Sequence, residues 1–329
     1  DGSRYDDPNL LAREVIRAAR DVGLRIALLR VAYARAGYQT DPTPQQVRFI
    51  ESSPDEYLPH LEQLLAAPEL NQTPDAWVGV APHSVRAVPL DYLKTVVEFA
   101  NSRRLVVHMH VAEQTAEVAA CIEEYRRSPV ALLDTEGLLS ERFTAVHAIH
   151  VTPKAIAALA RGRANVCACP TTERNLGDGV VPVDGYFNAG VAVSLGTDSQ
   201  TQIDLLEDAR ELEYHLRLQH TARNVLAPEN DTHESALAQR LFACATTSGA
   251  TSIGFDGGTL EPGAPADFFT VDLDDPSIAG STPDNLLTNV VFSLSRTAIK
   301  DVVVGGKTIV ADGRHTQEQE IVRQFRRLQ

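Results

Sequence analysis

The chain has 329 residues, of which 43% are hydrophobic and 6% are aromatic, and its formal net charge at pH 7 is −14. This length suits one large α/β domain with a small appendage. The acidic balance argues against binding to nucleic acid or to an anionic membrane, and an anionic substrate would need a local cationic pocket. We find no run of 18 apolar residues and no signal peptide, so we expect a cytoplasmic protein.

The N-terminal part predicts a helix, a strand and a long loop. Apolar side chains recur at helical spacing over Leu10–Val22, and Leu24–Ala32 is an apolar strand. The stretch Ala36–Pro59 contains four prolines and predicts an irregular loop, of the kind that covers an active site or contacts a partner. A helix is predicted at His60–Ala67.

Two candidate binding residues follow the next predicted strand, Trp77–Ala81. His83 and Arg86 come just after this strand ends. The guanidinium of Arg86 could hold a carboxylate through two hydrogen bonds. An isolated arginine can equally be a solvated surface charge, and the sequence alone leaves both interpretations open.

The stretch Leu105–Glu113 combines a buried strand with chemically active side chains. His108 and His110 are two residues apart, so both would face the same side of a strand. Glu113 follows His110 by three residues. A histidine at a strand end with a nearby carboxylate suits metal-assisted hydrolysis, in which one residue is a ligand and the other carries a proton. The alternative is a pair of ordinary core or surface histidines.

Later strands end in similar residues. Thr144–His150 ends in histidines, and the strand Val191–Gly196 is followed by Asp198. Core packing does not readily explain three strands that end in His, His and Asp, whereas a barrel of parallel strands collects its chemistry at the strands' C-terminal ends. Counting from the N-terminus, six strands alternate with helices and predict a parallel sheet covered on both faces; they begin at Leu24, Trp77, Leu105, Thr144, Ala164 and Val191.

The cysteines and the C-terminal region complete the pattern. The four cysteines form no disulfide framework, and we predict Cys167 and Cys169, which share one strand face, to be small buried hydrophobic residues. After Gly257 the sequence predicts short β segments, including NVVFSL, a hairpin turn at Gly305–Gly306 and a polar helical tail. Neither a phosphate-binding GxxxxGK[ST] loop nor a GxSxG nucleophile motif occurs.

Taken together, the segments APHSVRAV, HMHVAEQ, AVHAIH, NLGDG and GTDSQ resemble the amidohydrolase superfamily of metal-dependent barrel hydrolases. Within the superfamily they are most similar to the formiminoglutamate deiminases of histidine degradation. The resemblance extends into the C-terminal segments GTLEPGAPADFF and IKDVVVGGKTIVADGRH. It implies a TIM-like (β/α)8 barrel, represented by strands three to eight over residues 1–256, and a remnant of a small β-sandwich domain plus a C-terminal helix over residues 257–329.

The resemblance also implies catalytic and metal-binding roles. His110 would be the metal ligand from the fifth barrel strand, and Asp198 would bind the metal and accept a proton from water. His147 would orient or polarise the attacking hydroxide. Glu113 would carry protons to the leaving amine. The implied cofactor is one divalent metal per subunit, expected to be zinc.

The substrate roles come from the same resemblance. His83 and Arg86 would bind the substrate, with Arg86 holding a carboxylate, and His108 and His150 would be structural. The implied reaction hydrolyses N-formimino-L-glutamate to N-formyl-L-glutamate and ammonia. The expected partner is therefore a small dicarboxylate substrate.

One part of the family pattern has no counterpart in these 329 residues. The family has an HxH pair at the end of its first barrel strand, whereas the only HxH here is His108–His110. We therefore expect barrel strands one and two to be absent, zinc to bind weakly and this polypeptide to be poorly active. Exposed sheet edges could pair in a homodimer. Two alternatives stay open: a deaminase of ring amidines, which would not need Arg86, and a truncated, metal-free remnant.

Overall fold

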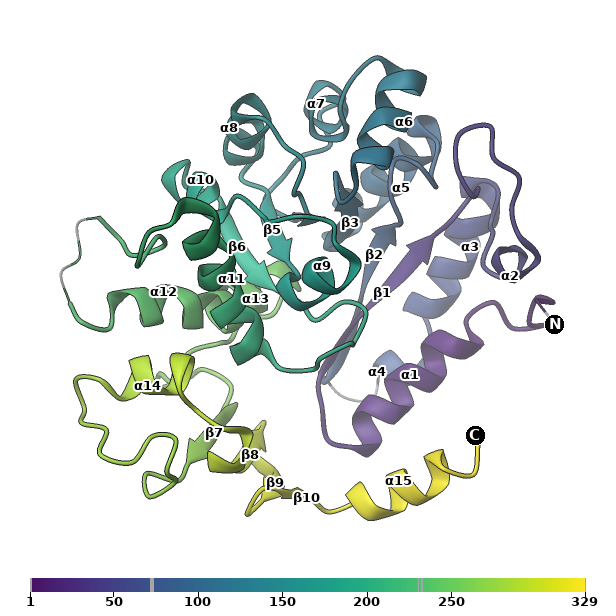
Figure 1. The fold of residues 1–329 in the computed structure, drawn as a ribbon. Coiled ribbons are helices and arrows are strands. Elements are labelled where there is room, and N and C mark those ends of the chain that lie inside the picture. The colour runs from purple at the N-terminus through teal and green to yellow at the C-terminus, as the bar shows by residue number, and fades with distance from the viewer. Residues whose placement is uncertain (1, 72–73, 230, 232, 329) are drawn as a thin grey trace.

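The computed structural model describes residues 2–71, 74–229, 231 and 233–328, and a six-stranded parallel sheet lies at its centre (Figure 1). The spatial order of the strands is their order in the sequence, so each crossover leads to a neighbouring strand, as in a (β/α) barrel. The predicted α/β fold class is confirmed. The strands are β1 (Ile26–Ala32), β2 (Ala76–Pro82), β3 (Val107–Val111), β4 (Phe143–His147), β5 (Asn165–Ala168) and β6 (Ala192–Leu195).

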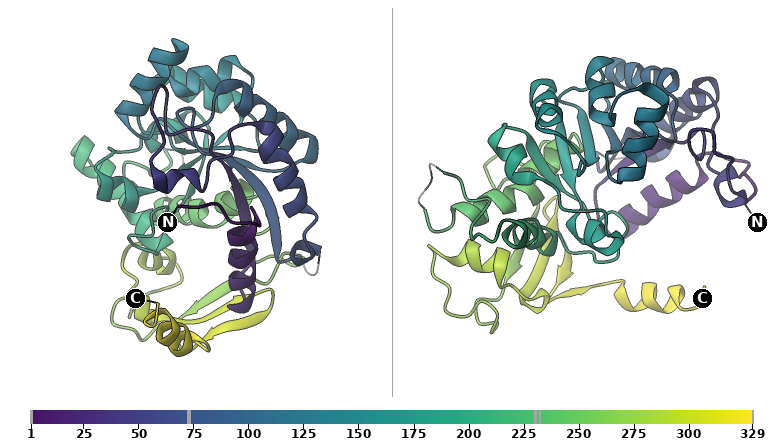
Figure 2. Two further views of the ribbon diagram at one scale, coloured as in Figure 1. Left: turned by 90° about the vertical axis from the view of Figure 1, so that its right-hand side faces the viewer. Right: turned by 45° about the horizontal axis from the view of Figure 1, so that its top comes forward.

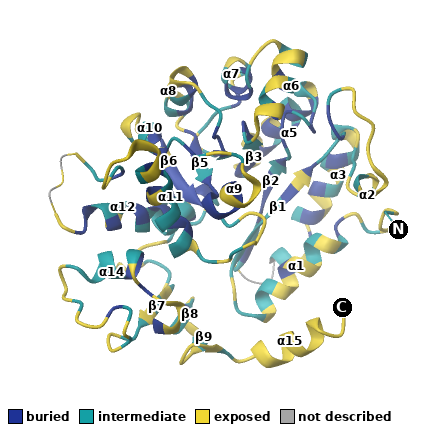
Figure 3. Ribbon diagram, in the orientation of Figure 1, coloured by how far each residue is buried: buried dark blue, intermediate teal, exposed yellow. Residues whose placement is uncertain are grey.

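Helices cover the outer face of this sheet. Their buried sides are apolar and their outer sides are exposed, as Figure 3 shows. Side-chain caps fix the starts of two of them, where Thr152 and Asp204 accept hydrogen bonds from backbone amides. The helices that follow or flank the strands are α1 (Leu10–Asp21), α3 (Pro54–Leu65), α4 (Pro68–Asn71), α5 (Leu90–Arg103), α6 (Thr115–Tyr125), α7 (Pro129–Thr135), α8 (Pro153–Gly162), α10 (Val183–Asn188), α11 (Leu205–His220) and α12 (Ala236–Ala245).

Residues alternate between the helix-covered face and the inner face of the sheet. In β3, Val107, Met109 and Val111 are at most 1% exposed in the core, and the two histidines occupy the alternate positions. The inner face is closed at the strands' N-terminal end by the residues just after α13 (Thr247–Ser252): the Trp77 indole N–H donates to the Ile253 carbonyl oxygen at 2.7 Å. The opposite, C-terminal end of the strands is therefore the end that can hold a site.

Two whole helices and half of a third lie where the sequence predicted loops. The predicted loop Ala36–Pro59 contains α2 (Pro44–Val47) and the first half of α3, which begins at Pro54 rather than at His60. Pro54 occupies the first helical position, where a missing N–H costs nothing, and burial of other α3 residues compensates for Pro59 inside the helix. The polar stretch PTTERNLGDG, whose composition predicts a loop after the strand that begins at Ala164, contains α9 (Pro170–Leu176), which starts at a proline and ends before Gly177 at φ 73°.

The C-terminal region forms a second, antiparallel sheet, whose strands are drawn in light green and yellow in Figure 2. The strand order is β10-β9-β8-β7. Its strands are β7 (Phe268–Val271), β8 (Ile299–Val304), β9 (Lys307–Ala311) and β10 (Arg314–His315), and α15 (Glu318–Phe325) follows them. The predicted hairpin turn is confirmed, with Gly305 and Gly306 at φ 58° and 75° between β8 and β9. The Arg25–Asp267 ion pair joins this sheet to the start of β1. The division at residue 256 stays a prediction.

The predicted β segment NVVFSL is wrong. These residues belong mostly to the helix α14 (Leu286–Phe292), whose Val290 packs with Leu294, Ile278 and Ala298 in a small second core. A short apolar run does not distinguish a strand from a buried helix, and tertiary packing decided the outcome here. None of the helices in the described ranges is both long and apolar enough to cross a membrane.

Candidate active site

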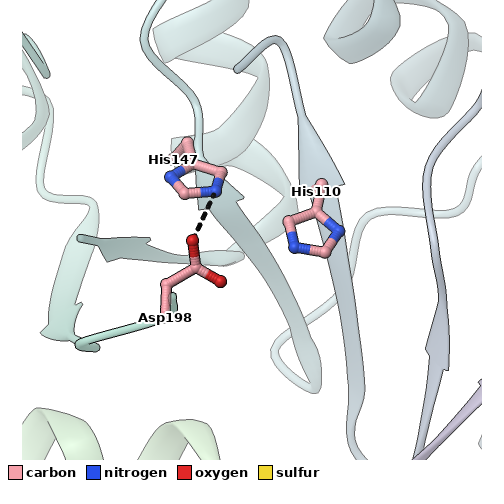
Figure 4. Close-up of side chains that lie close together, drawn as sticks. All are labelled: His110, His147 and Asp198. Carbon is pink, nitrogen blue, oxygen red and sulfur yellow. Dashed lines mark ion pairs between the residues drawn. The ribbon is translucent and has the colours of Figure 1, made fainter. Parts of the chain in front are cut away.

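Three predicted residues converge at the C-terminal end of the parallel strands (Figure 4). His110 comes from β3, His147 ends β4, and Asp198 lies in the loop after β6. One donor atom from each residue can be chosen so that all three lie within 4.8 Å of one another. The two imidazole rings are nearly parallel, with centroids 5.6 Å apart, and His147 Nε2 lies 3.9 Å from Asp198 Oδ2.

A backbone carbonyl group fixes the orientation of the His110 ring. Its Nδ1–H donates to the carbonyl oxygen of His83 at 2.8 Å, and the His110 backbone N–H donates to the same oxygen at 3.1 Å. The hydrogen bond at Nδ1 leaves Nε2 with its lone pair free to bind a cation.

An unusual backbone conformation brings His147 into the site. Strict alternation along β4 would place its side chain with Phe143 and Ala145 on the helix-covered face. Instead the backbone turns left-handed, with φ 68° at His147 and 50° at Ala148, and the ring lies beside that of His110. Such backbone geometry is costly for residues with a Cβ and is concentrated at functional sites.

The two ring nitrogens of His147 have different environments. Nδ1–H donates to Glu173 Oε1 at 3.1 Å, whereas Nε2 is buried and has no hydrogen-bond partner within the described residues. Nε2 lies 3.8 Å from Glu113 Oε1 and faces Asp198. Burial lowers the pKa of His147, but Glu173, Glu113 and Asp198 outweigh it and the net pKa is raised. A buried polar atom without a partner costs about 1–3 kcal/mol, so Nε2 calls for a ligand at this point.

Glu117 holds the turn that positions Glu113. Its two carboxylate oxygens accept the backbone N–H groups of Ala112 and Glu113, each at 3.0 Å, across a turn in which Ala112 has φ 53°. The Glu113 carboxylate is thereby directed toward His147 while remaining 22% exposed. Glu117 was not predicted from the sequence, although a glutamate at the third position of a helix is a usable signal for hydrogen bonds to backbone N–H groups at the helix start.

Replacing Glu117 with glutamine is expected to flatten the pH dependence of stability. Burial raises the pKa of Glu117 from 4.5 to about 6, despite its two backbone hydrogen bonds. The folded chain therefore binds more protons than the unfolded chain between these pH values, and the free energy of unfolding falls as pH rises through that window. The group accounts for about 2 kcal/mol of this fall. Denaturant unfolding at pH 4 and pH 7 measures it, and Glu123→Gln, at an exposed position on α6, is the control. An unchanged slope in Glu117→Gln contradicts the prediction.

Three consecutive residues of α9, Thr171 to Glu173, hold His147 and the loop of Asp198 in place. Glu173 accepts hydrogen bonds from His147 and from the backbone N–H of Cys169. Thr172 donates its hydroxyl proton to the Thr197 carbonyl oxygen at 2.9 Å and accepts the Ser199 backbone N–H at 3.1 Å, which fixes the residues on either side of Asp198. Neither residue was predicted as part of the site, because the composition of this polar stretch favours a loop.

Thr171, the first of the three α9 residues, is bound to α11 through Asp208. The hydroxyl and backbone N–H of Thr171 both donate to Asp208 Oδ1, at 2.9 and 3.0 Å. Asp208 is fully buried, and burial raises its pKa to about 6. Thr171, Thr172 and Glu173 thus link α11 to the residues around His147 and Asp198.

Replacing Glu173 with glutamine is expected to lower the pKa of His147. The amide oxygen can still accept both hydrogen bonds, but the negative charge that favours the protonated imidazole is lost. Titration of the histidine ring resonances by NMR in metal-free protein measures the pKa. The control is Glu141→Gln, an exposed residue paired with Arg163. A His147 pKa equal to that of the wild type would show that Glu173 only fills space.

The two predicted substrate-binding residues lie beside this cluster. The His83 ring packs between Tyr33 and His110, with centroid distances of 4.9 and 4.8 Å. Burial, followed by the charges of His110 and Arg86, lowers the pKa of His83 to about 3, so its ring is neutral. Arg86 is half-buried and donates from Nη1 to the Ala36 carbonyl oxygen at 2.8 Å. Within the part of the chain that the structure describes, Arg86 forms no ion pair with a carboxylate.

The remaining two histidines of the predicted strands bind backbone carbonyl groups away from the cluster. His108 Nε2 pairs with the Ser252 carbonyl oxygen at 2.8 Å, and His150 Nε2 pairs with that of Asp178 at 2.8 Å. His150 lies beyond β4, which ends at His147 rather than continuing to residue 150 as predicted.

Comparison with known proteins identifies the family. The sequence pattern of the Amidohydrolase family matches residues 3–309. The chain belongs to the amidohydrolase family. Formimidoylglutamate deiminase from Pseudomonas aeruginosa is 35% identical over 326 residues, which are 99% of this chain and 70% of that protein. The crystal structure of an amidohydrolase from Brucella melitensis superimposes with a TM-score of 0.90 at 33% identity and likewise covers 99% and 70% of the two chains.

Two other similar proteins are named for different substrates. The 5-methylthioadenosine/S-adenosylhomocysteine deaminase of Natronomonas pharaonis is 32% identical over 256 residues, 76% of this chain and 57% of that protein. A Xanthomonas campestris adenosine deaminase with bound zinc has the same fold, with a TM-score of 0.81 at 23% identity over 96% of this chain and 68% of that chain.

The described residues fit a divalent metal ion. One donor atom from each of two imidazoles and one carboxylate lie within 4.8 Å of one another, and zinc accepts this donor set. The His110 tautomer leaves Nε2 available, and the unpartnered Nε2 of His147 faces the same point. A cation with its water at this point would satisfy these atoms, so amidohydrolase chemistry is compatible with the site.

Proposed function

We propose that the chain is a metal-dependent deiminase that hydrolyses N-formimino-L-glutamate to N-formyl-L-glutamate and ammonia. The observation that carries the proposal is the convergence of His110, His147 and Asp198 at one end of the parallel sheet, with Glu113 beside them. The 35% identity to a formimidoylglutamate deiminase supports the choice of reaction. The free charge of Arg86 supports the choice of substrate, because N-formimino-L-glutamate has two carboxylates.

Each residue has a separate role in the proposed reaction. His110 and Asp198 would hold the ion, which when bound would polarise the substrate and lower the pKa of an adjacent water toward about 7. The Asp198 carboxylate accepts a proton from the attacking water, and His147 Nε2 orients that water by a hydrogen bond. The water oxygen adds to the formimino carbon. Glu113, acting as an acid, gives a proton to the imino nitrogen as this bond forms, which leaves an amino group and a hydroxyl group on the same carbon. The hydroxyl proton then passes to Glu113 and the proton held by Asp198 passes to the amino group, so the C–N bond breaks, ammonia leaves and the carbonyl group forms.

The substrate is held on the side of His83 and Arg86. The neutral His83 ring donates or accepts a hydrogen bond without adding charge beside the metal ligand His110. The Arg86 guanidinium has donors left after its bond to Ala36, and it pairs with a substrate carboxylate. This local positive charge compensates for the overall charge of −14, which would otherwise repel a dianion.

A deaminase of ring amidines is the second candidate, because a 32% identical relative is named for methylthioadenosine. Ammonia release from N-formimino-L-glutamate and from 5′-methylthioadenosine, measured with zinc-loaded protein, separates the two. Turnover of the first substrate alone supports our proposal, and turnover of the second alone rejects it. We expect slow turnover because the 329 residues contain no second HxH pair. If the protein is free of metal and shows no turnover after zinc is added, the third interpretation, a non-catalytic remnant, is supported.

We also propose that the chain is cytoplasmic and forms a homodimer. All four cysteines are free, which suits a reducing cytoplasm. Among the described strands, β1 pairs only with β2 and β6 only with β5, so each leaves one edge open. An open edge offers backbone groups to another chain, which supports the proposed homodimer. Light scattering at several concentrations would show a dimer, and a monomer throughout would reject it.

A further inference from the structure

Two cysteine side chains lie together near the donor atoms of His110, His147 and Asp198, which we call the hydrolytic donor set. Cys167 occupies an inner-face position of β5, opposite Val146 of β4 and Ser194 of β6, and Cys169 follows the strand two residues later. A Cβ atom added at Gly196 would lie 3.1 Å from Cys167 Sγ and 3.3 Å from Cys169 Sγ. Both sulfur atoms therefore occupy the space that this glycine leaves free.

Cys169 also lies within reach of two polar residues already described. One donor atom each from Cys169, His147 and Glu173 lie within 4.8 Å of one another, and all three residues are buried. This group shares His147 with the hydrolytic donor set but offers sulfur in place of His110 and Asp198. Sulfur ligands favour soft metal ions, whereas imidazole and carboxylate ligands also accept harder ones.

Hydrophobic packing alone does not explain this arrangement. Cys121 and Cys244 are also buried, at 3% and 2% exposure, and they do pack as small hydrophobic residues in the core beneath the helices. Neither belongs to a group of potential metal ligands among the described residues. Cys167 and Cys169 differ from them in lying next to each other and next to a histidine–glutamate pair.

We propose that Cys167 and Cys169, together with His147 and Glu173, form a second cation site that takes soft, thiophilic divalent ions. One donor atom each from Cys169, His147 and Glu173 lie within 4.8 Å of one another, and the Cys167 sulfur, which lies with that of Cys169 beside Gly196, would complete the set. An ion held by Cys169 and Glu173 would replace the hydrogen bond between His147 Nδ1 and Glu173 that orients the ring toward the hydrolytic site. Occupation of the second site would therefore inhibit the proposed hydrolysis, a consequence that rests on the proposed function.

Titration with Cd²⁺ alone tests the site directly. The wild-type chain is expected to develop the ultraviolet charge-transfer absorption of sulfur–cadmium bonds, saturating at one ion per chain. The variant Cys167→Ser/Cys169→Ser should lose this absorption, and Cys121→Ser/Cys244→Ser, matched in number and burial, should retain it. No absorption in the wild type, or equal absorption in both double variants, overturns the proposal.

Two further measurements separate this proposal from failure of the hydrolytic site and from misfolding. His110→Ala removes a hydrolytic ligand only, so it should retain the cadmium absorption even where zinc-dependent turnover is lost. In wild-type protein, Cd²⁺ should slow alkylation of Cys167 and Cys169 by iodoacetamide relative to that of Cys121 and Cys244, because a sulfur bound to an ion is not free to attack the reagent. Mass spectrometry of the peptides measures the alkylation of each cysteine in the wild-type protein, so no variant is needed. Equal protection or no protection of the four cysteines rejects the site.

Discussion

Replacing Asp198 with asparagine is expected to lower kcat for N-formimino-L-glutamate by at least about 10³-fold and to reduce the zinc content of the protein. The amide is the same size as the carboxylate, but it is a poor metal ligand and cannot accept a proton from water. Asp198 has both roles in our proposal, and its Oδ2 lies 3.9 Å from His147 Nε2 in the shared donor group. Ammonia release measures turnover, and plasma emission spectrometry measures bound zinc.

The zinc measurement is informative even if turnover by the wild-type chain is slow. Asp184→Asn is a suitable control, because Asp184 is a carboxylate of α10 that pairs with His220 and is absent from the donor group. It should keep the wild-type zinc content and rate. If Asp198→Asn also kept both, Asp198 would have no part in metal binding or proton transfer, and the proposed mechanism would be wrong.

Replacing Arg86 with alanine is expected to lower kcat/KM for N-formimino-L-glutamate by about 10²- to 10³-fold, as expected for losing one partner of a partly buried charge pair. Arg86 is half-buried and forms no ion pair within the described residues, so its charge is available for a substrate carboxylate. Arg86→Lys should restore only part of the loss, since an ammonium group cannot bind a carboxylate in the same bidentate manner. Steady-state kinetics with both variants measures the effect.

A truncated substrate shows whether Arg86 acts through the carboxylate. Formamidine has the reacting C=N group but no carboxylate, so its low turnover should be the same in wild type and in Arg86→Ala. The control variant is Arg161→Ala, which removes an arginine of α8 whose side chain is 64% exposed. Unchanged kinetics of Arg86→Ala with N-formimino-L-glutamate would favour the ring-amidine deaminase instead.

The sequence was sufficient to predict the sheet and the convergence of the site. Parallel strands bring their C-terminal ends to one edge, so residues at the ends of three apolar segments, His110, His147 and Asp198, were expected to meet. The six strands lie within a few residues of their predicted positions because buried parallel strands have a strong apolar signal. Arg86 and His83 were also found by their position after a strand.

The residues that hold the site in place were not predictable in the same way. Glu173 and Thr172 act through hydrogen bonds to partners 25 to 27 positions away, and no local pattern indicates such a contact. The left-handed turn at His147 is a backbone feature of a residue type that seldom adopts it. Helix α14 was misassigned for a different reason, because its short apolar run suits either a helix or a strand.

The dependence of the site on α9 has a consequence for the order in which activity and fold are lost on heating. A helix of seven residues has little stability of its own, and only its contacts with the rest of the chain, among them those of Thr171 with Asp208, keep it formed. Detachment of this one segment would release His147 and the Asp198 loop while the large core remained intact. Thermal inactivation should therefore begin several degrees below the melting temperature of the sheet, and it should be reversible on cooling.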